Sequence, residues 1–210
     1  MTPAFTRTAL ALLAGMLVAG RAAAQETDSR LERLDAATRP TVAALVDSAR
    51  TAMLPTEPLV QRALEGATKR ASGDVIVAAV RRLAVDLGHA RDALGSTASP
   101  AELAAGAAAL RAGASQTILA ELRHARREPL TVPLAVLADL VASGVPVDSA
   151  AAAVLGLAAR ARDADLVEFR RAVERDIALG APPSAATAAA ATAADVFVNA
   201  GARQQRPGRP

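Results

Sequence analysis

The chain has 210 residues, of which 52% are hydrophobic and 1% aromatic, and its net charge is +3. This length allows one domain with a substantial core, and the small net charge argues against a nucleic-acid-binding protein. Because the core must be filled mainly by Leu, Val, Ile and Ala, the composition favours packed helices over a sheet.

Residues 1–24 have the pattern of a secretory signal peptide, with Arg7 before an apolar run and small residues before Gln25. An uncleaved anchor is the alternative, but the apolar run is shorter than the ~20 residues of a bilayer span, and no later segment qualifies. Removing Arg7 and Arg21 lowers the net charge from +3 to +1. Without cysteine the chain has no lipid anchor and no disulfide. The sequence therefore predicts an exported protein, periplasmic or extracellular.

The segment 25–39 is polar, with a short helical pattern at Leu31 and Leu34 that predicts a frayed or weakly docked lead-in. A helical domain is expected over 40–199, and residues 200–210 are expected to form a disordered basic tail. The apolar spacing predicts helices over 40–53, 57–70, 74–94, 100–112, 116–122, 131–143, 147–159, 166–179 and 183–198.

Capping residues and breaks support these boundaries. Ser99 with Glu102 forms a capping box around Pro100, and Asp165 with Glu168 is predicted to form a second one. Thr131 is placed to cap the helix that it precedes. Helices are expected to end where glycine can adopt a left-handed conformation, followed by Pro or Ser, as at Gly113, Gly144 and Gly180.

Similar breaks follow Gly144 and Gly180, but their spacing is irregular. The predicted fold is therefore all-α, with antiparallel helical hairpins forming a compact bundle or a short irregular α-solenoid. On the surface, Arg82 and Asp86 lie one helical turn apart and are expected to pair, as are Glu65 and Lys69.

The sequence shows no catalytic, cofactor-binding or metal-binding motif. His89 and His124 have no second ligand at metal-binding spacing, and there is no Gly-x-Ser-x-Gly elbow or phosphate-binding loop.

Two groups of charged residues are candidates for a functional site. Arg123, His124, Arg126 and Arg127 could contact an anionic partner such as an envelope lipid or polymer, although a solvated helix end explains them as well. Asp139 stands among apolar residues and is a candidate buried charge. If buried it needs a partner, for which Arg171 or Arg175 is available; otherwise it lies on a wet strip of its helix.

The segments LPTEPLVQRALEGATKR (54–70) and LTVPLAVLADLVASGVP (130–146) resemble segments of uncharacterised exported all-helical proteins of high-GC bacteria. The resemblance covers about a third of the chain. It implies an exported helical domain and names no active-site residue.

Three hypotheses of function follow. The first is a non-enzymatic interaction or structural module of the cell envelope, whose partner is an unknown protein or envelope component. The second is a carrier that encloses an apolar ligand, such as an acyl chain, between helices. The third is an enzyme that uses a carboxylate such as Asp139 or Glu65.

Overall fold

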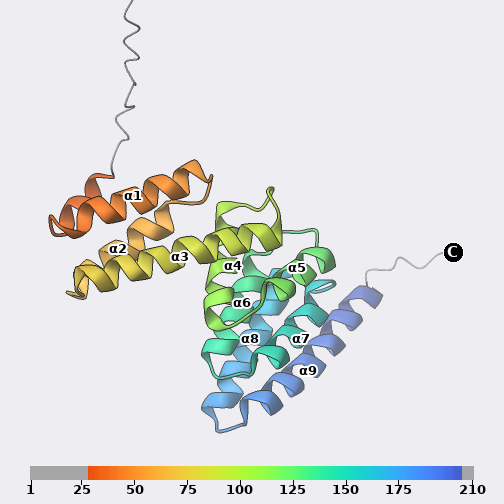
Figure 1. Cartoon of the computed structure of the whole chain (residues 1–210). Coiled ribbons are helices and arrows are strands. Elements are labelled where there is room, and N and C mark those ends of the chain that lie inside the picture. The colour runs from red at the N-terminus through yellow and green to blue at the C-terminus, as the bar shows by residue number, and fades with distance from the viewer. Residues whose placement is uncertain (1–27, 205–210) are drawn as a thin grey trace, which may run out of the picture.

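The computed structural model describes residues 28–204, and within that range the chain is helical with no strand (Figure 1). This confirms the all-α prediction, while the predicted signal peptide lies outside the described residues. None of the described helices combines the length and apolar character of a membrane span. The described elements are η1 Ser29–Arg33 (a 3-10 helix), α1 Thr38–Thr51, α2 Glu57–Thr68, α3 Gly73–Leu94, α4 Pro100–Ala112, α5 Gln116–Ala125, α6 Thr131–Ala142, α7 Val147–Ala158, α8 Asp163–Ala178 and α9 Pro183–Gln204.

The helices form a two-layer stack. In the odd-numbered layer α1 packs on α3, α3 on α5, α5 on α7 and α7 on α9; in the even-numbered layer α4 packs on α6 and α6 on α8. The layers are joined by pairs that are neighbours in sequence, including α2 with α3, α3 with α4 and α8 with α9. This packing of each helix on near neighbours along the chain is consistent with a compact bundle, the first of the two predicted alternatives.

The core of the stack is aliphatic and closely packed. Its fully buried side chains are mostly leucines, including Leu87, Leu119 and Leu140. Helices α3 and α4 approach closely at Gly106, where an added Cβ would lie 3.0 Å from the Cβ of Ala90. Small residues thus allow the two backbones to approach one another.

Five helix ends share one hydrogen-bonding pattern, the Schellman motif. At each end a residue two or three positions after the helix donates its N–H to a carbonyl five residues earlier, as Val145 does to Leu140 at 3.1 Å. The residue before this donor has a positive φ at all five ends: Met53 (55°), Arg70 (54°), Gly113 (116°), Gly144 (90°) and Gly180 (96°). The ends predicted at glycine are confirmed, but two further ends use a residue with a side chain.

Replacing Met53 with glycine is expected to stabilise the protein. Met53 is 81% exposed, so its side chain contributes little packing, whereas a non-glycine residue in the left-handed region carries steric strain. After the entropy cost of glycine is subtracted, we expect the free energy of unfolding to rise by about 0.5–1 kcal/mol. Gly144→Ala, the opposite change at an equivalent position, should lower it by about 1 kcal/mol. Urea denaturation measures both, and a destabilised Met53→Gly variant would contradict this view of the helix end.

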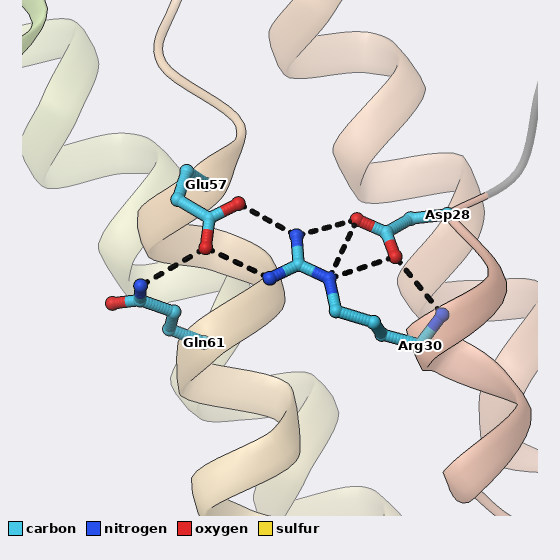
Figure 2. Close-up of polar contacts among 4 residues, drawn as sticks. All are labelled: Asp28, Arg30, Glu57 and Gln61. Atoms are coloured by element: carbon cyan, nitrogen blue, oxygen red, sulfur yellow. Dashed lines mark hydrogen bonds and ion pairs between the residues drawn. The ribbon is translucent and has the colours of Figure 1, made fainter.

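The polar lead-in is more firmly docked than the sequence predicted. Leu31 and Leu34 are 1% and 3% exposed and belong to the core. Figure 2 shows that the Arg30 guanidinium bridges Asp28 and Glu57, with its Nη2 atom 2.6 Å from an oxygen of each carboxylate. The prediction of a weakly docked segment is therefore wrong for the described residues, because two apolar side chains and a bridging arginine attach η1 to the start of α2.

Three other local predictions are corrected. Thr131 does not cap α6 but is its first residue, and Leu130 occupies the cap position. Helix α8 starts at Asp163, and the Asp165 carboxylate accepts the N–H of Arg162 at 3.0 Å, so the predicted box at Asp165 is displaced by one turn. Helix α9 continues to Gln204 instead of ending near Val198, because the sequence beyond that point contains no proline before residue 207.

Candidate functional site

The predicted arginine cluster is divided between the interior and the surface. His124 and Arg127 are exposed, whereas Arg123 and Arg126 form ion pairs with carboxylates of other helices. Arg126 is 6% exposed, so its guanidinium is not available to an external anion. The four residues therefore do not form one continuous contact surface, and a role in binding remains a prediction only for the exposed pair.

Glu102 is the centre of the first internal group. Its side chain lies in the first turn of α4, where it accepts the N–H of Ser99 at 2.8 Å and completes the predicted capping box. It also accepts the buried N–H of Leu130 at 2.9 Å and pairs with Arg123. One carboxylate thus connects the start of α4 to α5 and to the segment before α6. Burial raises the pKa of Glu102, but the N–H groups of Ser99 and Leu130 together with Arg123 outweigh this effect and lower it to about 2.

This carboxylate should make stability depend on pH. The unfolded chain binds a proton at Glu102 near pH 4.5, whereas the folded chain remains ionised down to about pH 2. The contribution of Glu102 is therefore complete above pH 4.5 and is lost as the pH falls from there to about 2. We expect the difference in unfolding free energy between wild type and Glu102→Gln to shrink over that range. A difference that stays constant from pH 6 to about pH 2 would show that the charge is unimportant.

Arg126 holds a second internal group. Its guanidinium donates to the carbonyl of Ala161 at 3.0 Å and to the carboxylate of Asp163 at 2.6 Å. Ala161 follows the end of α7 and Asp163 begins α8, so this side chain, which follows α5, fixes the turn between those two helices. The guanidinium also lies 3.5 Å from the carbonyl of Ala158, the last residue of α7, which is a group that the end of a helix leaves unpaired.

Asp139 is not a buried charge. Its side chain is 48% exposed and pairs with Arg170 at 3.1 Å, not with Arg171 or Arg175. The predicted alternative, in which Asp139 lies on a solvent-exposed strip of its helix, is therefore correct. Because α6 packs on α8, the partner is set by contact between the two helices, which the sequence spacing did not reveal.

The sequence did not predict a groove formed by α2, α3 and α4. It consists of two adjoining depressions of about 410 and 280 Å³, both lined by Arg62 of α2 and Arg111 of α4. Arg82 of α3 lines the smaller depression. We call this surface the arginine groove. Its remaining polar lining is Gln61 and Glu65, and its apolar lining is Pro58, Ala79, Leu83, Ala104 and Ala108.

The ion pairs around this groove leave it positively charged. Arg62 pairs with Glu65 at 2.9 Å, and Glu65 also pairs with Lys69 at 2.6 Å, as predicted. Asp86 pairs with Arg111 at 3.3 Å, so the predicted pair of Arg82 with Asp86 is wrong. Within the described chain no carboxylate lies at ion-pair distance from Arg82. The pKa of Glu65 is lowered, first by its hydrogen bond to Lys69 and then by the charges of Arg62, Lys69 and Arg111.

A second pocket lies between α8 and α9. Its volume is about 470 Å³, and its apolar lining includes Phe169, Ala172, Ala190 and Ala194. Charged residues, among them Asp165 and Arg175, also line it. This is the one site between helices in the described chain that combines an aromatic ring with alanine walls.

No known protein family, curated protein or solved structure matches the chain. The resemblance to exported helical proteins of high-GC bacteria therefore remains a prediction. Neither pocket had a sequence signal of its own, because each is assembled from residues on different helices. The only hint was the occurrence of Arg62, Arg82 and Arg111 on helix faces whose neighbours could not be assigned from the sequence.

Proposed function

We propose that this protein is an exported, non-enzymatic interaction module of the cell envelope, which binds a partner in the arginine groove. The observation that carries this proposal is the groove itself, a concave surface to which three helices each contribute an arginine. Binding sites in helical proteins commonly lie in clefts between helices. Two of the charged residues considered as sites, Arg123 and Arg126, are already engaged in holding helices together.

Export is part of this proposal and is supported by the signal-peptide pattern of residues 1–24. Fractionation of the native host, followed by mass determination of the protein, tests it. Recovery outside the cytoplasm, with a chain that begins at Gln25, is the expected result. Recovery of the intact chain in the cytoplasm would contradict export.

Site-specific photocrosslinking in the native host tests the binding function. A photoreactive amino acid is placed at Ala108, which is exposed in the groove, and in a second strain at Ala44, which is exposed on α1. We expect a discrete crosslinked species from position 108 and none of that mass from position 44. The absence of an adduct at 108, or the same adduct from both positions, would contradict a partner in the groove.

The pocket between α8 and α9 favours a second candidate function, the carrier of an apolar ligand. Phe169 and the surrounding alanines offer an apolar surface of the kind that an acyl chain requires. Native mass spectrometry of the protein from its host distinguishes this function. A co-purified lipid mass that disappears when Ala190 is replaced by leucine would support a carrier, whereas the bare protein mass alone would count against it.

A further inference from the structure

The arginine groove lies where the even-numbered layer of the stack is interrupted. Helices α4, α6 and α8 pack directly on one another, and the odd-numbered helices do so from α1 to α9. The corresponding pair α2 and α4 is not packed in this way, because each lies against a different half of α3 (Figure 1). Gly66 of α2 approaches Ile76, while Gly106 of α4 approaches Ala90 and Leu94. The length of α3 thus separates two helices that would otherwise be neighbours.

The arginines that line the groove have N–H groups that form no hydrogen bond within the described chain. A guanidinium group has five N–H donors. Arg62 and Arg111 each direct one nitrogen to a carboxylate in the hydrogen bonds formed here, Arg62 to Glu65 and Arg111 to Asp86. Arg82 is exposed and makes no side-chain hydrogen bond within the described chain. An anion in the groove could therefore gain charge-assisted hydrogen bonds without breaking the existing pairs.

The rest of the lining indicates what kind of anion fits. Ala79, Leu83, Ala104 and Ala108 form apolar surface, which suits the methylene groups of side chains better than a hydrated phosphate. Glu65 would repel a ligand as densely charged as a polyphosphate. Gln61 donates to Glu57, which leaves its carbonyl oxygen available to a main-chain N–H. A carboxylate-bearing polypeptide matches all three features.

The dimensions of the groove favour an extended segment. Gln61 and Arg62 lie within a wall of α2 that runs from Pro58 to Glu65, which corresponds to about 10 Å of helix. About three residues of an extended chain cover that length. In such a chain alternate side chains point to the same side, so acidic residues two positions apart would both face the arginines.

We propose that the arginine groove binds a short, extended acidic segment of a partner polypeptide, with carboxylates at alternate positions bound by Arg62, Arg82 and Arg111. This inference rests on the proposed function and specifies its partner. It assigns the groove to recognition of carboxylates rather than to binding of lipid or phosphate polymer.

Fluorescence anisotropy with a labelled peptide of about seven residues, in which glutamate alternates with alanine, tests the proposal. We expect saturable binding to the full-length protein that weakens as salt rises from about 50 to about 300 mM. Arg82→Gln should weaken the affinity about tenfold, because one charge-assisted interaction is lost. The matched control is Arg81→Gln, which removes the same charge from an exposed position of the same helix outside the groove and should change the affinity less than about twofold.

Several outcomes would overturn the proposal. Equal losses of affinity in the Arg81 and Arg82 variants would show that only nonspecific electrostatic attraction acts. Equal binding of a peptide with glutamine in place of glutamate would show that the groove does not recognise carboxylates. Groove-dependent binding of polyphosphate or anionic phosphatidylglycerol vesicles, with no binding of the acidic peptide, would assign the arginines to phosphate. If Arg82→Gln lowers the melting temperature, Arg82→Lys provides a second test. Lysine keeps the positive charge but lacks the planar guanidinium group, so this variant should still weaken peptide binding several-fold.

The two proposals can fail separately. If the crosslink at position 108 persists but the acidic peptide does not bind, the groove has a partner of another chemistry and only this inference is wrong. If the crosslink is absent, the proposed function itself fails.

Discussion

Replacing Glu102 with alanine is expected to lower the free energy of unfolding by about 3–5 kcal/mol, the largest effect of any single change considered for this protein. The substitution leaves the partly buried guanidinium of Arg123 and the buried N–H of Leu130 without their acceptor. It also removes the reciprocal half of the capping box at Ser99. These three partners belong to separate parts of the chain but share one carboxylate. A single substitution therefore removes all of their interactions.

Urea denaturation at neutral pH measures this loss. Glu121→Ala is the matched control, because Glu121 is an exposed glutamate of the adjacent α5 and should change stability by less than about 0.5 kcal/mol. Glu102→Gln keeps an acceptor oxygen without the charge and should fall between wild type and alanine. A loss below about 1 kcal/mol for Glu102→Ala would show that water replaces the carboxylate without penalty, which would contradict its role as a structural centre.

Arg126→Ala is expected to cost about 3 kcal/mol. The guanidinium is buried, and its removal leaves the carbonyl of Ala161 unpaired and a void where the side chain packed. Asp163 is half-exposed and can be hydrated again, so most of the loss should come from the carbonyl and the void. Arg126→Met keeps much of the volume and should recover part of the loss, which separates packing from hydrogen bonding.

The neighbouring Arg127 provides the control for this experiment. It is exposed, and Arg127→Ala removes the same charge at the next position, so we expect a change within about 0.5 kcal/mol. Thermal and urea unfolding of both variants measure the contrast. Similar losses at the two positions would mean that the net charge of the segment, and not the buried contacts of Arg126, determines its stability.

The parts of the fold that follow from local chemistry could be predicted from the sequence. Ser99 and Glu102 cap α4 as expected, because the motif contains both donors and acceptors within one turn. Gly113, Gly144 and Gly180 mark helix ends because glycine alone enters the left-handed region without strain. Met53 and Arg70 adopt the same conformation, and their residue types gave no indication of it.

The parts that depend on distant contacts could not be predicted. Leu31 and Leu34 are buried because α1 and α2 lie over them, which the polar composition of the lead-in concealed. The true partner of Asp86 lies on another helix, and the spacing along α3 suggested Arg82 instead. The arginine groove is the same kind of case, since it exists only where α2 and α4 lie on different halves of α3.

The packing of each helix on its near neighbours in the stack has a consequence for how the protein unfolds. A helix in the middle, such as α5, is held from both sides, whereas α9 is held only by α7 and α8. Opening can therefore begin at a terminal helix and advance inward without disrupting the opposite end. Amide hydrogen exchange should be fastest in α9 and slowest in the central helices, and a mechanical pull on the termini should release the chain in successive steps.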